Sequence, residues 1–205
     1  MSQSPAPQRR RGNVRGEHTR SVLLDAAVRS FADRGFHGTS TRDIALAADM
    51  SPAVVYAHYA TKEDLLFELS LDGHRSVHAL LEAEVGRHRS SIDRLRAAAT
   101  GFGRWHAEFH TLARVVQYEL NALSEPHLAE VAALRRVTQG LFAELVRDGV
   151  DQGVFHVADI DMTATSLTSL GIDVARWYRP TGAWTPEQIG RHHGLLALRT
   201  VGASE

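Results

Sequence analysis

Pairs of histidines are the residues of this 205-residue chain whose spacing could support metal chemistry. His74 and His78 are four residues apart, as are His106 and His110, so each pair shares one face of a helix. The segment HAEFH differs from the zinc-protease motif HExxH because Glu108 lies two residues after His106 and points to another side of the helix. Since no clear third ligand accompanies either pair, we expect surface or cavity histidines and no bound metal.

Other catalytic arrangements do not stand out in the sequence. The chain contains no Cys, which excludes disulfides, thiolate metal sites and iron–sulfur clusters. No Ser/His/Asp arrangement, phosphate-binding Gly loop or pair of catalytic carboxylates stands out, so we expect neither an enzyme nor a cofactor. No apolar stretch follows the N-terminal arginines, and no run is long enough to cross a bilayer. We therefore expect a cytoplasmic protein without a membrane partner.

The elements that must position the polar residues are helices. Apolar residues recur at steps of three and four along most of the chain, whereas no alternating strand pattern is present. Ser40 with Asp43, and Thr185 with Gln188, have the spacing of capping boxes at helix starts. The sequence therefore predicts an all-α fold of about nine helices.

Charge is divided unevenly along the chain. The 23 Lys+Arg and 24 Asp+Glu residues give a net charge of −1. Residues 1–62 contain nine basic and five acidic residues, whereas residues 63–205 contain 14 basic and 19 acidic residues. The basic segment suits a polyanionic partner, and it ends at Lys62, the only Lys of the chain.

Two short helices in close succession form the most specific motif. A turn containing Asp49 joins them, and Ser51 with Pro52 provides the cap and the first position of the second helix. The segment TRDIALAADMSPAVVYAHYATKEDLL, residues 41–66, resembles the DNA-binding domain of the tetracycline-repressor (TetR) family of bacterial transcription regulators. The similarity covers residues 23–66. Asp49 departs from it, because the family usually has Gly in this turn, although Asp also tolerates left-handed backbone.

The resemblance implies a helix-turn-helix whose second helix enters the major groove of DNA. We expect residues 1–15 to form a disordered basic arm, residues 16–62 the three-helix DNA-binding domain, and residues 63–205 a helical domain for effector binding and dimerisation. A matching Lys of the family contacts a DNA phosphate, which is the role expected of Lys62. The positions that carry over as DNA-facing are Thr41, Arg42, Pro52, Ala53, Tyr56, Ala57, His58 and Lys62.

The second helix of this motif contains no Arg, Asn, Gln or Lys to make bidentate contacts with base edges. Direct readout is then expected from apolar contacts with thymine methyl groups by Pro52, Ala53 or Ala57. A further hypothesis assigns a minor-groove contact to the basic arm, which contains Arg9, Arg10, Arg11 and Arg15. The alternative for residues 1–15 is a solubilising tail.

The C-terminal helices of the chain carry apolar or small-residue faces that little remaining sequence can cover. In TetR-like proteins the equivalent helices form a four-helix interface between two subunits, which predicts a homodimer. The alternative is that these faces close the core of a monomer. The residues expected at the dimer interface are Leu167, Leu170, Gly171, Val174, Ile189, His193 and Leu196.

The resemblance also implies a ligand cavity between the DNA-binding helices and the dimer helices. The candidate residues are aromatic or apolar with a few polar groups, as in organic-ligand cavities, although the same composition describes a helical core. The stretch from Trp105 to residues 177–182 is loosely similar to family members that sense fatty-acyl or steroid CoA thioesters, which favours a lipophilic effector. The candidates are Phe102, Trp105, His106, Phe109, His110, Tyr118, Asn121, Phe142 and Trp177.

Together these patterns predict a homodimeric repressor that binds a palindromic double-stranded DNA operator and is released by a small effector, an acyl-CoA-like or other hydrophobic compound. Two alternatives from other classes stay open. One is a helical ligand-binding protein that does not regulate genes, which a gel-shift assay with its own upstream DNA would distinguish. The other is a histidine-dependent metalloprotein, which metal analysis would test.

Overall fold

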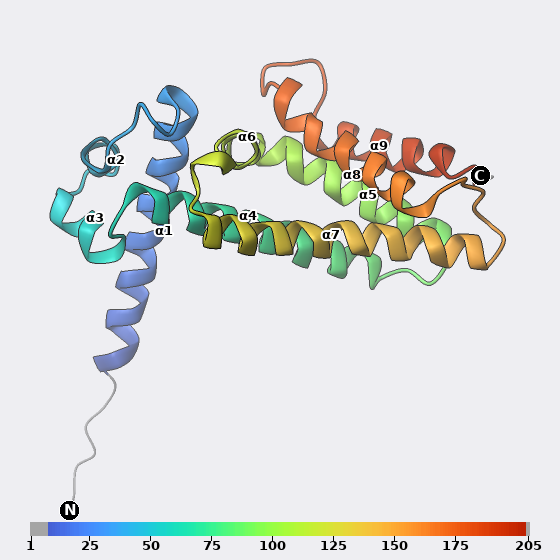
Figure 1. Cartoon of the computed structure of the whole chain (residues 1–205), viewed down its shortest axis with the longest axis horizontal. Coiled ribbons are helices and arrows are strands. Elements are labelled where there is room, and N and C mark those ends of the chain that lie inside the picture. The colour runs from blue at the N-terminus through green and yellow to red at the C-terminus, as the bar shows by residue number, and fades with distance from the viewer. Residues whose placement is uncertain (1–7, 204–205) are drawn as a thin grey trace, which may run out of the picture. The chain divides into compact units, whose positions relative to one another are not determined.

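The computed structural model describes the backbone of residues 8–203 and the side chains of residues 16–203. Within that range it contains nine α-helices, one short 3₁₀ helix and no strand, which confirms the all-α prediction (Figure 1). The elements in chain order are α1 (Gln8–Arg34), α2 (Thr41–Ala47), α3 (Pro52–His58), α4 (Lys62–Val85), α5 (Ser91–Glu108), α6 (His110–Tyr118), η1 (Leu120–Ala122), α7 (Glu125–Asp151), α8 (Ile160–Trp177) and α9 (Pro186–Thr200).

Two compact units make up the chain, Met1–Leu69 and Ser70–Glu205. The division falls inside α4, whereas the sequence placed it at the start of that helix, after residue 62. Leu65, Leu66 and Leu69 in the first turns of α4 are buried and belong to the first unit. The beginning of α4 is therefore part of the core that supports the short helices before it.

The first helix begins at Gln8, earlier than the sequence pattern predicts. Gln and Arg, which dominate its first turn, are good helix formers, so the backbone from residue 8 onward is helical where an arm was expected. Residues 1–7 lie outside the described residues, as do the side chains of residues 8–15. The hypothesis that Arg9, Arg10, Arg11 and Arg15 contact DNA therefore stays a prediction.

Local capping explains where the short helices begin. The Ser40 hydroxyl accepts from the Asp43 N–H at 3.2 Å, and the Asp43 carboxylate accepts from the Ser40 N–H at 2.8 Å, which confirms the first capping box. Pro52 occupies the start of α3, where its missing N–H costs no intrahelical bond. Between α2 and α3, Asp49 adopts a left-handed conformation with φ of 54°. The turn thus has the backbone geometry for which Gly is best suited.

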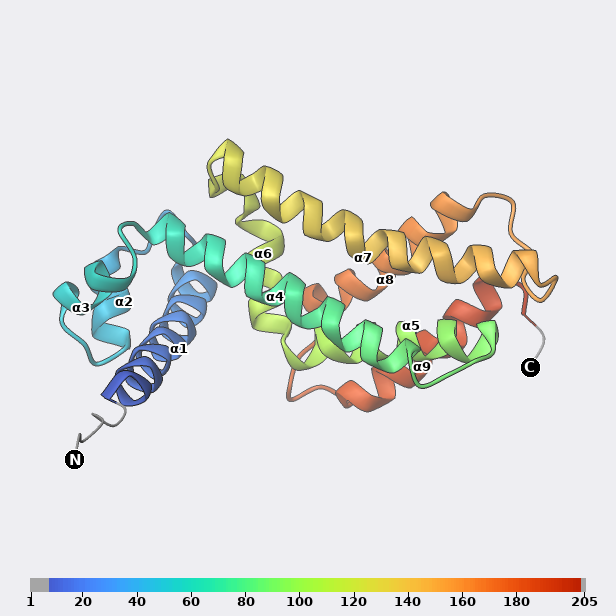
Figure 2. The same ribbon diagram turned by 90° about the horizontal axis from the view of Figure 1, so that it is seen from below.

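Close approach of α5 and α9 organises the second unit. A Cβ atom added at Gly190 of α9 would lie 2.6 Å from the carbonyl oxygen of Thr100, and one at Gly194 would lie 2.3 Å from the Thr100 hydroxyl. These two glycines therefore let the helices pack backbone against backbone. The two helices lie side by side (Figure 2). Phe102 of α5 and Phe142 of α7 lie in the same core, with ring centroids 5.4 Å apart.

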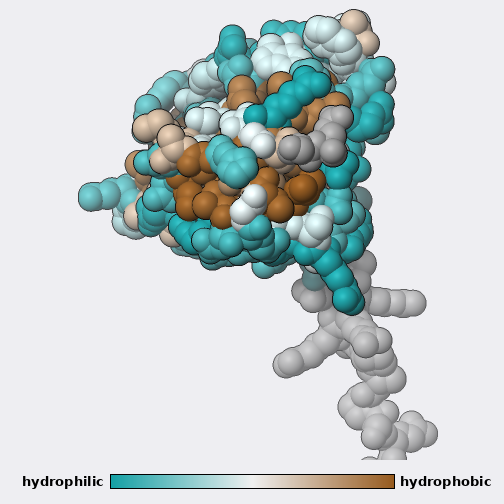
Figure 3. Space-filling model, turned by 90° about the vertical axis from the view of Figure 1, so that its right-hand side faces the viewer, coloured by the Kyte–Doolittle hydropathy of each residue, from teal (hydrophilic) through white to brown (hydrophobic). Residues whose placement is uncertain are grey.

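The core of the second unit extends to the end at which α7 and α9 finish. Phe155 and Val201 are buried there, and a Cβ added at Gly149 would overlap the Phe155 ring. Figure 3 looks onto this end and shows apolar side chains at its centre with hydrophilic side chains around them. None of the helices in the described part of the chain combines the length and apolar character needed to cross a membrane.

Candidate nucleic-acid interface and ligand cavity

The short helices α2 and α3 present one buried and one exposed face. Ile44 of α2 and Val55 of α3 are fully buried, so they fix the two helices against the core of the first unit. The residues predicted to face DNA lie on the opposite side: Thr41 and Lys62 are half-buried, whereas Arg42, Pro52, Ala53, Tyr56, Ala57 and His58 are exposed. All eight side chains thus belong to the first unit, and six of them are exposed.

A hydrogen bond joins the exposed faces of α2 and α3. The hydroxyl groups of Thr41 and Tyr56 lie 2.8 Å apart, and the Tyr56 side chain is 55% exposed. Because Thr41 opens α2 and Tyr56 lies in the middle of α3, this contact ties the phenol ring to the neighbouring helix. Tyr56 is therefore oriented in advance of binding, which reduces the entropy lost on contact with a partner.

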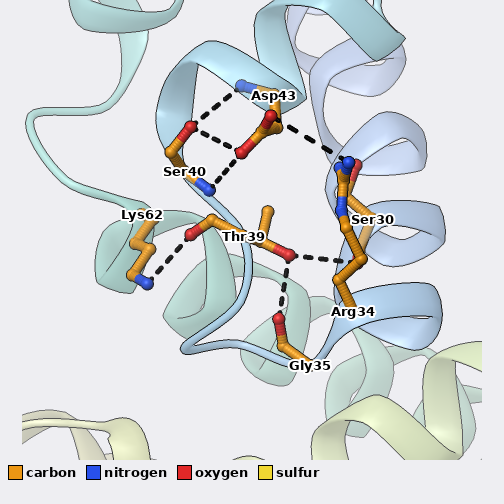
Figure 4. A network of polar contacts seen from close by, with 7 residues as sticks. All are labelled: Ser30, Arg34, Gly35, Thr39, Ser40, Asp43 and Lys62. Atoms are coloured by element: carbon orange, nitrogen blue, oxygen red, sulfur yellow. Dashed lines mark hydrogen bonds and ion pairs between the residues drawn. The ribbon is translucent and has the colours of Figure 1, made fainter.

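A polar network holds the start of α2 against α1 (Figure 4). The Thr39 hydroxyl donates to the carbonyl oxygens of Ser30 at 3.0 Å and Gly35 at 2.8 Å. Hydrogen bonds from Ser40 hold the pKa of the Asp43 carboxyl below its usual value, and Arg34 lies 3.9 Å from that carboxylate. The helix start beside Thr41 and Arg42 is thereby fixed in position.

Lys62 has protein partners within the first unit. Its ammonium donates to the carbonyl oxygens of Phe36 at 2.7 Å and Thr39 at 2.9 Å. It also lies 4.3 Å from the centre of the Phe36 ring, a cation–π contact. These contacts attach the connection between α1 and α2 to the start of α4, a structural role that the sequence did not indicate. The predicted phosphate contact of Lys62 stays a prediction.

A cavity of about 250 Å³ lies inside the second unit. Three of the nine predicted effector residues line it, namely Phe102, Trp105 and His106 of α5. Phe142 instead packs against Phe102 in the core. The remaining five do not line this cavity: His110 packs against the Tyr178 ring, Asn121 is exposed, and Phe109, Tyr118 and Trp177 are 46%, 58% and 39% exposed.

The break between α5 and α6 explains why Phe109 and His110 lie away from this cavity, whereas Tyr118 lines a neighbouring one. The sequence pattern predicts one stripe of apolar side chains through Phe109 and leaves open a break near His110 and Thr111, and the structure has that break, since α5 ends at Glu108 and α6 begins at His110. A change of helix direction at Phe109 ends the three-and-four periodicity that places side chains on one face. Phe109 and His110 therefore leave the stripe, whereas Leu112, Ala113 and Val116 of α6 line the cavity again.

Polar residues of α7 and α8 line the cavity and were missed at the sequence level. Thr138 and Thr168 are 6% and 8% exposed, so both lie on inward helix faces. Their spacing from apolar neighbours, such as Thr138 with Phe142 and Thr168 with Ile172, is the signal that could have revealed them. The polar lining residues supplied by the two helices are Arg135, Thr138, Gln139, Thr165, Thr168 and Ser169.

A second cavity of about 270 Å³ adjoins the first. Both are lined by Gln117, Arg135, Ser169 and Ile172, so the two spaces are neighbours along these residues. The second space is also lined by Arg114 and by Arg176, which forms a bidentate pair with Asp173 at 2.6 and 2.9 Å. We call the first space the inner compartment and the second the outer compartment, which carries the arginines.

Hydrogen bonds determine which ring nitrogen carries the proton in the two histidines that line the inner compartment. Nδ1 of His74 donates to the carbonyl oxygen of Ser70 at 2.7 Å, and Nδ1 of His106 donates to that of Phe102 at 2.9 Å. Burial lowers the pKa of both rings, that of His106 to about 4. Among the described residues no three His, Asp or Glu side chains gather as metal ligands.

Part of the predicted dimer interface is buried inside the monomer, which corrects that prediction. Leu167 is 6% exposed and Val174 is fully buried. Val174 packs in one cluster with Ile189, and a Cβ at Gly171 would lie 2.3 Å from the Phe102 ring. These faces close the core of the monomer, because α8 and α9 pack against α5.

Other residues of α8 and α9 stay available on the surface. Leu170 is 47% exposed, and His193 and Leu196 are partly exposed. Two large apolar side chains that the sequence did not assign to this interface, Met162 of α8 and Leu195 of α9, are 69% and 39% exposed. An interface on these helices would use this narrower set of side chains.

Two family models match the chain. The model described as bacterial regulatory proteins, tetR family, matches residues 23–69. The model described as tetracyclin repressor-like, C-terminal domain, matches residues 88–201. The first match contains the α2–α3 motif, and the second contains most of the residues that line the two compartments.

Individual proteins are similar over nearly the whole chain. A bacterial regulatory protein in the tetR family from Rhodococcus RHA1 is 42% identical with a TM-score of 0.86, covering 91% of this chain and 98% of its own. The transcriptional repressor KstR2 of Mycobacterium tuberculosis is 27% identical over 188 residues, 87% of this chain and 90% of its own length. Its structure, described as that of a ketosteroid transcriptional regulator, matches with a TM-score of 0.82. The transcriptional activator FasR of Mycolicibacterium smegmatis is 30% identical over 180 residues, 85% of this chain and 78% of its own length.

Proposed function

Because the chain belongs to the TetR family of bacterial transcription regulators, we propose that it binds operator DNA as a homodimer and releases it when a small molecule enters the second unit. Regulators of this family bind DNA and small effectors and form dimers. The chain is thus a regulator and not an enzyme. As a DNA-binding protein of a bacterial family, it acts in the cytoplasm.

The observation that carries this function is the exposed face of α2 and α3. Arg42 supplies a cation beside the helix start that Thr41 opens, and Tyr56 supplies a hydroxyl held by Thr41. Such groups suit phosphate contacts, whereas the exposed Pro52 and Ala53 suit apolar contact with thymine methyl groups. In a symmetric dimer the two α3 helices would lie roughly 34 Å apart, so the operator is expected to be palindromic.

The residues that line the two compartments suit a lipophilic effector that carries an anionic group. The inner compartment is lined by Phe102 and Trp105, and the outer one by Arg114 and Arg135. An acyl chain or sterol skeleton fits the apolar end, and a carboxylate or the phosphates of a CoA thioester fit the arginines. The description of the relative KstR2 as a ketosteroid transcriptional regulator agrees with a lipophilic effector.

Release requires that the effector bind the DNA-competent and the DNA-incompetent states with different affinity. We propose repression rather than activation, since KstR2 is named a repressor. FasR is named an activator, so the direction of control needs its own measurement. Expression from the promoter upstream of the gene that encodes this chain, measured with and without the regulator, distinguishes repression from activation.

Fluorescence anisotropy with a labelled fragment of that upstream DNA tests the proposed function. Wild type should bind it far more tightly than a scrambled fragment, and Arg42→Ala should weaken binding. Arg87→Ala is the matched control, since Arg87 is an exposed arginine of the second unit. If wild type binds both fragments alike, the chain is better described as a helical ligand-binding protein that does not regulate genes.

A further inference from the structure

One arginine between the two compartments has no acidic partner among the described residues. Arg135 of α7 is partly buried and lines both spaces. Its Nη2 donates to the neutral amide oxygen of Gln117 at 3.1 Å, and burial lowers the pKa of its guanidinium with no carboxylate to oppose that effect. Because a partly buried charge without a counterion is costly, an anionic ligand group would recover free energy at Arg135.

The other arginines of these spaces are placed differently. Arg114 and Arg176 line the outer compartment and not the inner one. Arg176 already has a counterion, because the hydrogen bonds and charge of Asp173 raise the pKa of its guanidinium. Of the described arginines, Arg135 is therefore the one that reaches the inner compartment and also lacks an acidic partner.

The guanidinium of Arg135 lies at the junction of the two compartments. Gln117, to which it donates, also lines both spaces. His74 lines the inner compartment, and the charge of Arg135 adds to the effect of burial in lowering the pKa of the His74 ring. The positive charge is therefore within electrostatic range of the inner wall.

The inner compartment offers an apolar body a place next to this charge. Its walls include Trp105 of α5 and Leu112 and Val116 of α6. A carboxylate attached directly to a body in this space would reach Arg135, whose planar guanidinium can donate two parallel hydrogen bonds to it. A CoA thioester with the same acyl body would place a neutral carbonyl there, since its phosphates lie at the far end of a long arm.

We propose that the effector is a free carboxylic acid with an apolar body, and that Arg135 binds its carboxylate at the junction of the two compartments. An alcohol with the same body lacks the negative charge, so it would leave the guanidinium without a counterion. This inference rests on the proposed function, because it narrows the class of effector for the same cavity.

Isothermal titration of the full chain with three eight-carbon probes tests the inference. The probes are octanoate, 1-octanol and octanoyl-CoA, because the inner space of about 250 Å³ equals the volume of roughly eight water molecules and suits a chain of this length. Wild type should bind octanoate about tenfold more tightly than 1-octanol, the gain expected of charge-assisted hydrogen bonds. It should also bind octanoate more tightly than octanoyl-CoA.

Two neighbouring arginines of α7 provide the variant and its control. Arg135→Gln should weaken octanoate binding about tenfold and leave the affinity for 1-octanol unchanged, which also shows that the cavity is intact. Arg136→Gln should leave both affinities unchanged, because Arg136 is exposed and lines neither compartment.

Each other outcome overturns the inference. Octanoate may fail to bind or bind no more tightly than 1-octanol; Arg135→Gln may weaken both ligands alike, which indicates a structural role, or act no differently from Arg136→Gln. Tighter binding of octanoyl-CoA than of octanoate would assign the arginines to phosphates instead. Operator binding of the same preparations, measured without any probe, reports on the proposed function separately. Specific DNA binding without a preference for octanoate would remove only the carboxylate recognition.

Discussion

The ammonium of Lys62 lies 2.7 Å from the carbonyl oxygen of Phe36 and 4.3 Å from the centre of the Phe36 ring. A second bond, of 2.9 Å, joins it to the Thr39 carbonyl oxygen. The only Lys of the chain thus holds the connection between α1 and α2 against the start of α4. These contacts within the first unit are sufficient to explain why a Lys occupies this position, with no need for a DNA phosphate.

Replacing Lys62 with Met should destabilise the first unit by about 1–3 kcal/mol, because the hydrogen bonds from the ammonium to two carbonyl oxygens are lost. Chemical denaturation followed by circular dichroism measures this loss. Arg29→Met is the control, since Arg29 is an exposed cation of α1, and it should have little effect on stability. A phosphate-only role predicts the opposite pattern: unchanged stability, with a salt dependence of operator binding reduced by about one unit of slope.

Asp49 is expected to limit the stability of the turn between α2 and α3. Its φ of 54° lies in the left-handed region, which Gly adopts without the steric cost that a Cβ imposes. Asp49→Gly should therefore raise the free energy of unfolding by about 0.5–1 kcal/mol, whereas Asp49→Ala should lower it by about 1 kcal/mol. Equal effects of the two substitutions would show that the side chain, and not the backbone conformation, decides stability here.

The helix-turn-helix was predictable because its signals are local. Caps such as Ser40 with Asp43 act within one turn, and the spacing of Ile44 and Val55 marks inward faces that the structure buries completely. The bonds of Lys62 were not predictable, since they join positions 23 and 26 residues apart in sequence. Only the fold brings such groups together.

Those predicted effector residues that line the inner compartment come from α5 alone. Phe102, Trp105 and His106 were identified because aromatic residues on α5 follow a clear helical stripe. Thr138 was overlooked because a single Thr in a long helix has the same appearance whether it faces solvent or a cavity. The prediction that Val174 lies at the dimer interface was wrong for a related reason. Its apolar side chain would suit a partner subunit, but helices of the same chain, α5 among them, already cover it.

The remaining exposed apolar side chains of α8 predict the position of the dimer contact. Leu170 is 47% exposed, and Leu170→Glu would place a charge in an apolar interface. We expect this variant to be monomeric at concentrations where wild type is dimeric, as measured by light scattering after gel filtration. Val137→Glu is the control, because Val137 is 50% exposed on α7, and it should leave the dimer intact. Should Leu170→Glu stay dimeric, the contact lies on another surface.

His106 should make stability depend on pH in acid. Burial lowers its folded-state pKa to about 4, below the value of 6.5 expected when the chain unfolds. Between these values the unfolded state binds more protons, so the stabilisation is fully present above pH 6.5 and is lost as the pH falls toward 4. The loss amounts to about 3 kcal/mol for this one group.

Denaturation of wild type and His106→Gln at several pH values measures that contribution. Burial also lowers the pKa of His74 and His193, so these residues too reduce the stability of the fold in acid. Wild type and His106→Gln both retain them. The difference in unfolding free energy between the two proteins should therefore be constant above pH 6.5 and should shift against wild type by about 3 kcal/mol as the pH approaches 4. Parallel curves across the whole range would contradict a lowered pKa of His106 in the folded protein.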